Sequence, residues 1–98
     1  MSLQTTILCR VQANPERREF IKKILLTLVD HTLTEEGCVN FDLHQDNENK
    51  KLFICYENWE SKENWIRHYK RAKILDDTTK FNIHALDDYT SNEMTMIE

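Results

Sequence analysis

The stretch that decides the fold runs from Gly37 to His68 and reads GCVNFDLHQDNENKKLFICYENWESKENWIRH. Every second residue from Val39 to Leu43 is apolar, which predicts a strand with one buried face. Polar and turn-forming residues then fill positions 45–51, as is typical of a hairpin connection. From Leu52 to Tyr56 the run is apolar throughout, which predicts a partner strand covered on both faces.

A helix follows this hairpin. Ser61 is a suitable N-cap residue, and we expect the helix to run to about Arg71. Residues 72–79 are expected to form either a further turn or a second short helix. Trp65, His68 and Tyr69 fall at helical spacing, so they share one face, and that face should look at the sheet.

The flanking segments supply the other elements. Residues 3–12 alternate as a first strand, and Asn14-Pro15 marks the start of a helix that should end near Glu35-Glu36. Gly37, the single glycine, suits a helix end that needs positive φ. Residues 89–97 are expected to form a last strand. The apolar stripe of the first helix is predicted to comprise Phe20, Ile21, Ile24, Leu25 and Leu28.

The resulting order, β-α-β-β-α-β, predicts an α+β, ferredoxin-like domain with an antiparallel four-stranded sheet. Two helices cover only one face of such a sheet. Leu52, Ile54 and Tyr56 point to one side, whereas Phe53, Cys55 and Trp59 point to the other. An apolar face would therefore meet water in a monomer, so we expect a homodimer with the two sheets facing each other.

Composition narrows the functional classes. The 98 residues predict a single domain spanning 1–98, and a net charge of −4 gives no basic footprint for nucleic acid. No apolar run approaches a membrane span and no signal peptide is visible, so a cytoplasmic protein without membrane contact is expected. Three unclustered cysteines, Cys9, Cys38 and Cys55, are interpreted as reduced structural thiols.

Known cofactor motifs are not visible. The histidines are scattered without metal-ligand spacing, and a chain with one glycine has no glycine-rich phosphate loop. We therefore expect no metal, flavin or nicotinamide.

The helix face holds the first candidate site residues. His68 has an ordinary pKa near 6.5, which suits a base for an acidic phenol or hydroxyl. The alternative is a half-buried histidine that only hydrogen-bonds a neighbour. Trp65, with Tyr69 beside it, is either a flat wall for a planar substrate or a core residue.

The strands hold the remaining candidates. Tyr56 and Glu57 face opposite sides, so only one of them can reach a given pocket. Burying the charged carboxylate of Glu57 in so apolar a strand costs free energy unless a cation or a hydrogen-bond donor pairs with it. It is either a salt-bridge partner across the dimer or a functional carboxylate. Asn40 could orient a substrate carbonyl, although its face with Asp42 and His44 is the one expected to be exposed.

Together these residues resemble the antibiotic biosynthesis monooxygenase domain. The features that carry the resemblance are Glu36-Gly37-Cys38, the strand ending at His44 and Asp46, the Tyr56-Glu57-x-Trp59 strand end, and His68 in the next helix. The resemblance implies a dimeric α/β barrel. It also implies insertion of molecular oxygen into a quinol or a similar small aromatic or enolisable substrate, without metal or flavin.

The family that this sequence resembles includes two other branches. A haem-degrading branch needs a tryptophan where His68 stands, so its residue set is incomplete here. A branch that isomerises a phosphorylated signalling molecule has a tyrosine, a glutamate and a histidine similar to Tyr56, Glu57 and His68. The family often follows its helix histidine with a proline and a second histidine, where this chain has Lys70-Arg71-Ala72-Lys73. A non-catalytic ligand-binding dimer on the same fold is a further alternative.

Overall fold

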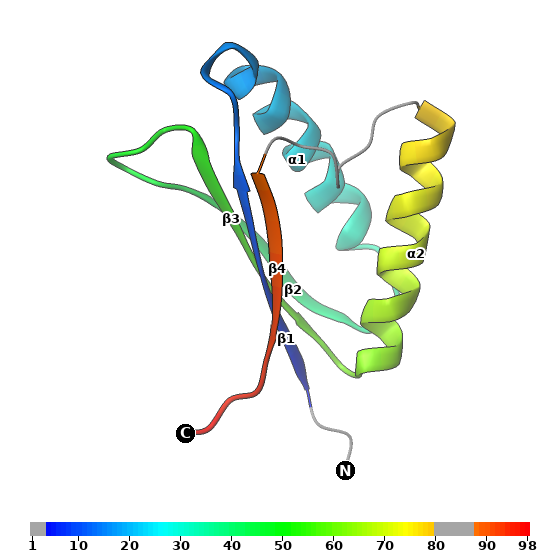
Figure 1. Cartoon of the computed structure of the whole chain (residues 1–98). Coiled ribbons are helices and arrows are strands. Elements are labelled where there is room, and N and C mark those ends of the chain that lie inside the picture. Colours follow the sequence, from blue (N-terminus) through cyan, green and yellow to red (C-terminus); the bar gives the residue numbers. More distant parts are fainter. Residues whose placement is uncertain (1–3, 80–87) are drawn as a thin grey trace.

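The computed structural model describes residues 4–79 and 88–98. Its sheet contains four antiparallel strands in the order β2-β3-β1-β4. Both helices lie on the same side of that sheet (Figure 1). This is the predicted ferredoxin-like α+β fold. The elements are β1 (Thr5–Gln12), η1 (Pro15–Arg17), α1 (Arg18–Thr32), β2 (Cys38–Gln45), β3 (Leu52–Trp59), α2 (Lys62–Thr79) and β4 (Asp88–Met94).

At Asn14-Pro15, where the sequence predicts the helix start, a short 3₁₀ helix (η1) begins; α1 itself begins at Arg18 and ends earlier than predicted. The Asn14 side chain accepts a hydrogen bond from the Glu16 amide at 3.0 Å, as an N-cap does. The helix ends at Thr32, because the amides of Thr34 and Glu35 bond carbonyls three residues back and form turns. Gly37 has the predicted positive φ, +84°, but it lies beyond the turns that follow α1 and does not cap that helix as the sequence predicts.

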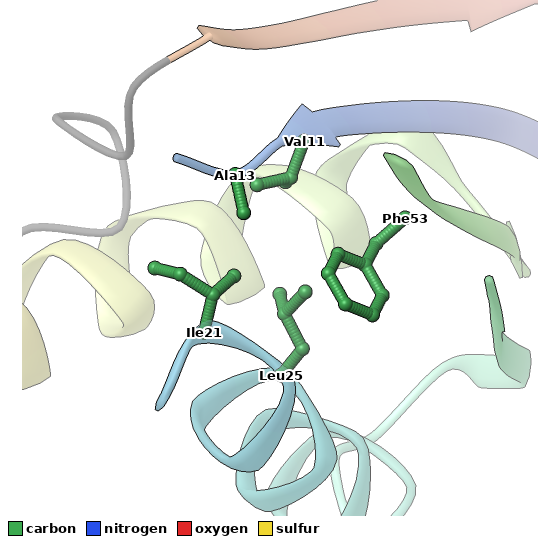
Figure 2. Packing of buried hydrophobic residues seen from close by; sticks show 5 residues of the cluster. All are labelled: Val11, Ala13, Ile21, Leu25 and Phe53. Atoms are coloured by element: carbon green, nitrogen blue, oxygen red, sulfur yellow. The ribbon is translucent and has the colours of Figure 1, made fainter. Parts of the chain in front are cut away.

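One residue of the predicted stripe on α1 is not in the core. Phe20 is 52% exposed, and the Arg17 guanidinium lies 5.8 Å from its ring centre. Ile21 and Leu25 are buried, as expected. They pack with Phe53 and the end of β1 (Figure 2), so the core under α1 is entirely apolar.

The second helix begins as predicted but is longer. Its first turn is capped by Ser61, whose Oγ accepts a hydrogen bond from the Asn64 amide at 3.2 Å. The helix continues without a break to Thr79, so residues 72–79 extend α2 and do not form a second short helix. A second buried cluster, including Ile7, Phe41 and Trp59, lies on the same sheet face.

The two faces of β3 differ as the sequence predicts. Phe53, Cys55, Glu57 and Trp59 are buried on the helix side. Leu52, Ile54 and Tyr56 lie on the opposite face, which neither α1 nor α2 covers. Among the described helices, none is long and apolar enough to cross a membrane.

Candidate functional site

A cavity of about 40 Å³ lies between α2 and the helix-covered face of the sheet. A water molecule needs roughly 10–15 Å³, whereas pockets for drug-sized ligands start near about 300 Å³. The cavity is therefore a narrow space in this conformation, with room for water but not for a drug-sized ligand. Its polar and aromatic lining comes from four strands and α2 and comprises Cys9, Phe41, Glu57, Trp65, His68, Tyr69 and Tyr89.

Glu57 is the buried carboxylate of this cavity. It is only 2% exposed, and no described lysine or arginine forms an ion pair with it. Two donors contact it instead: Trp59 Nε1–H donates to Oε1 at 2.9 Å and the Cys9 thiol to Oε2 at 3.4 Å. Burial raises the pKa of Glu57 to about 7, although both hydrogen bonds act in the other direction. Glu57 can therefore hold or release a proton near neutral pH.

This position bears on the two interpretations of Glu57. The carboxylate lies on the helix side of the sheet, away from the face through which a dimer is expected to pack. Tyr56, its neighbour, points to that opposite face. Of the two residues, Glu57 is the one that reaches the cavity.

The Cys9 sulfur has two further polar neighbours. Cys9 Sγ lies 3.6 Å from the Tyr89 hydroxyl and 3.9 Å from Ser91 Oγ. Burial and the nearby Glu57 raise the pKa of Cys9 to about 12. The thiol is therefore a hydrogen-bond donor at neutral pH and not a nucleophilic thiolate.

His68 forms another part of the cavity wall. It is 8% exposed, its ring is stacked on Trp59 at 4.8 Å between centres, and its Nδ1 lies 2.6 Å from Glu35 Oε2. Burial lowers the pKa of His68. The Glu35 carboxylate raises it, but by less, so the net shift is downward. The ring is therefore neutral at pH 7. A carboxylate oxygen at this distance accepts a hydrogen bond, so we assign the proton to Nδ1; the lone pair is then on Nε2 and can accept a proton.

Trp59 links the two titratable groups. Its indole donates to Glu57 and stacks under His68, while its own side chain is completely buried. The sequence predicts only that Trp59 points to the same side of the sheet as Phe53 and Cys55. Trp59 is buried, and it also holds both candidate proton acceptors in place.

The other candidates divide between the two sides of the sheet. Trp65 and Tyr69 line the cavity, with ring centres 6.1 Å apart. Asn40 and Tyr56 lie on the opposite face, where Asn40 Nδ2 donates to Asp42 at 3.0 Å. The structure therefore brings together His68, Trp65, Glu57 and Tyr69, but not Asn40 or Tyr56.

Sequence reasoning missed Cys9, Tyr89 and Glu35. Cys9 and Tyr89 lie on neighbouring strands 80 residues apart, so no local pattern relates them. The strand periodicity that placed Cys9 on an inward face was the only available signal.

The sequence profile of the antibiotic biosynthesis monooxygenase (ABM) family matches residues 5–76. This chain belongs to that family. No protein of curated function matches the sequence significantly.

Solved structures share the ABM fold over nearly the whole chain. PA3566 from Pseudomonas aeruginosa is similar, with 26% identity, a TM-score of 0.86, and coverage of 100% of this chain and 98% of that one. A conserved protein from Methanosarcina mazei Go1 has 21% identity, a TM-score of 0.80 and coverage of 95% and 92%.

SnoaB from Streptomyces nogalater, a cofactor-independent oxygenase, has 13% identity and a TM-score of 0.79, with coverage of 97% and 94%. That likeness concerns the fold. Membership of the ABM family supports a general monooxygenase-like function.

Proposed function

We propose that this ABM domain is a monooxygenase that needs no metal or flavin and acts on a quinol or another small aromatic or enolisable substrate. The observation that carries the proposal is the pairing of Glu57 and His68 on one buried cavity. Both can accept a proton at neutral pH, and environments that push pKa values in opposite directions are typical of catalytic sites.

Such a site suits a reaction in which the substrate supplies the electrons. His68 takes a proton from the substrate hydroxyl, and the resulting anion gives electrons to molecular oxygen, which adds to a ring carbon. That carbon loses its hydrogen and keeps one oxygen atom, while the O–O bond breaks and the other oxygen leaves as water, so a quinol and O₂ give a hydroxyquinone and water. The apolar surroundings strip water from the anion, which makes it a stronger reductant. Glu57 accepts a hydrogen bond from a second substrate hydroxyl, or exchanges a proton with it.

Trp65 and Tyr69 are proposed to form the wall through which substrate enters. Tyr69 is 41% exposed while it also lines the cavity, so it lies where the cavity approaches solvent. The cavity is smaller than a quinol ring needs. We therefore expect both rings to move when substrate binds, and to stack on it afterwards.

The isomerase alternative has less support. A phosphorylated substrate needs a cation or a ring of donors around its phosphate. The described cavity lining contains no lysine or arginine. Arg67 and Arg71 border a separate pocket, on the outer side of His68.

Oxygen uptake with a panel of reduced quinols, such as reduced menadione, tests the proposal. Wild-type protein should consume oxygen faster than autoxidation, in the presence of chelator, and the rate should rise with pH through the pKa of His68 as the neutral ring accumulates. His68→Gln should keep the fold and lose about 10²–10⁴-fold in rate, the usual contribution of a general base.

His31→Gln is the matched control, because His31 is exposed on α1 and lines neither pocket beside His68. It should retain full activity. Tight quinol binding without oxygen uptake would instead make the protein a non-catalytic ligand-binding dimer.

A further inference from the structure

His68 separates two spaces. One side of its ring lines the internal cavity that holds Glu57, and the residue also borders a small pocket at the surface. That outer pocket contains Glu35, Arg67 and Arg71. A group in this position can communicate with the buried reaction space and with charges near solvent.

The backbone fixes Glu35 on the outer side. The Glu35 amide donates to the Thr32 carbonyl at 3.0 Å, and its own carbonyl accepts from the Cys38 amide at 3.3 Å. These bonds hold the short connection between α1 and β2 against the start of α2. The Glu35 carboxylate thereby reaches His68 Nδ1 at 2.6 Å, while Arg71 lies 3.8 Å from its other oxygen.

We infer that Glu35 is a positioning residue that forms a dyad with His68 and makes it the base of the proposed reaction. The inference rests on the proposed function for its catalytic part. Glu35 does not line the cavity, so it acts on substrate only through the imidazole.

The dyad has two effects on proton transfer. Accepting the Nδ1 proton keeps the lone pair on Nε2, the nitrogen left to face a substrate. When Nε2 takes the substrate proton, the ring becomes an imidazolium, and the adjacent carboxylate stabilises that charge in a site where burial opposes it. The imidazolium later returns the same proton to the reduced oxygen, so the base is regenerated.

Charged and titratable groups face His68 from every described element packed around it. Arg71 opposes protonation of the ring, whereas Glu35 favours it. The groups that line the two spaces are Glu35 and Glu36 before β2, Arg67 and Arg71 on α2, Cys9 on β1, Glu57 on β3 and Tyr89 on β4.

Side-chain nitrogen NMR of His68 in wild type, Glu35→Gln and Glu35→Ala tests the dyad without substrate. Wild type should show the Nδ1–H tautomer. Glu35→Gln keeps an acceptor but loses the charge, so the tautomer should persist while the pKa of His68 falls further. Glu35→Ala loses both, so the Nε2–H tautomer should gain population. An unchanged tautomer and pKa in Glu35→Ala would overturn the inference.

Kinetics test the catalytic part separately. Glu35→Ala should lose at least about tenfold in kcat with KM nearly unchanged, since a general base contributes about 10²–10⁴-fold and Glu35 lies outside the cavity. The acidic limb of the pH profile should move to lower pH in Glu35→Gln.

Glu36→Gln is the matched control. Its carboxylate lies 3.8 Å from Arg67 and is largely exposed, and it makes no described contact with His68. Active wild type with an unaffected Glu35→Ala would refute the dyad alone. Wild type inactive on every quinol would refute the proposed function, and the NMR result would then decide whether Glu35 positions His68.

Discussion

At the scale of single residues, the site combines groups that stabilise the fold poorly. A buried carboxylate without a cationic partner among the described residues favours its protonated form, so it weakens the folded state once the pH is high enough to ionise it. Glu57 is such a group. This cost is understandable if the carboxylate serves chemistry.

Replacement of Glu57 by glutamine should therefore raise stability above neutral pH. The pKa of Glu57 rises from 4.5 in the unfolded chain to about 7 in the folded one. The folded state binds more protons between these values, so wild-type stability from this group falls as pH rises through that window. Glutamine does not titrate. The difference in unfolding free energy between variant and wild type should grow by about 2–3 kcal/mol from pH 5 to pH 8.

Urea unfolding at several pH values measures this difference. His68 acts in the opposite direction, because its lowered pKa makes stability fall on acidification below the unfolded value near 6.5. That contribution is common to both proteins and cancels. Glu60→Gln changes an exposed glutamate nearby and serves as the control. A constant difference across the pH range would contradict the assignment.

At the scale of elements, the junction between Gly37 and the first turn of α2 aligns the site. The Glu60 amide donates to the Gly37 carbonyl at 2.8 Å, and Asn64 Nδ2 donates to the Glu36 carbonyl at 3.2 Å. These bonds tie the start of β2 to the helix that carries His68. The close approach is possible because Gly37 has no side chain.

Gly37→Ala should destabilise the protein by more than the roughly 1–2 kcal/mol that a left-handed backbone costs an L-residue. A Cβ at this position would lie 2.3 Å from Asn64 Cγ, so the helix start or the Asn64 side chain must shift. Thermal unfolding should show the loss. In an Asn64→Gly background the steric contribution to the loss of stability should vanish. Only the contribution from the left-handed backbone should remain. Equal losses in both backgrounds would exclude the steric contact.

Local patterns in the sequence predicted the elements well and the site in part. Asn14 and Ser61 mark helix starts through hydrogen bonds within a few residues, so their roles were predictable. The positive φ of Gly37 was predictable too, but its place beyond the end of α1 was not. The helix face with Trp65, His68 and Tyr69 was predictable from spacing. The contact between Glu35 and His68 spans 33 residues and depends on how two connections meet, which no local pattern encodes. Phe20 was wrongly placed in the core because periodicity shows the direction of the buried helix face but not its width; the adjacent Ile21 is fully buried.

At the scale of the whole molecule, one sheet face lies uncovered by α1 and α2. Leu8, Leu52 and Ile54 lie on it, with Tyr56 beside them. Two such faces packed together would remove this apolar surface from water. The homodimer thus remains a prediction, and the apolar side chains on the uncovered sheet face support it.

Light scattering should give a mass near twice the chain mass of 11.8 kDa at micromolar concentration. Ile54→Lys places a charge at the centre of the uncovered face, between Arg10 and His44. We expect this variant to unfold instead of giving a stable monomer, because folding and dimer burial are linked.

Leu26→Lys makes a similar change on α1, at a side chain already half exposed, and should remain folded and dimeric. A wild-type mass near that of one chain would refute the dimer.

The contact between Trp59 and His68 has an optical consequence. The chain contains two tryptophans, so Trp65→Phe leaves Trp59 as the single indole fluorophore, in van der Waals range of the imidazole. Emission from Trp59 should change when that ring gains a positive charge and again when a ligand alters its surroundings. The protein therefore carries a built-in spectroscopic reporter, and occupancy of the cavity can be followed by fluorescence before any substrate is known.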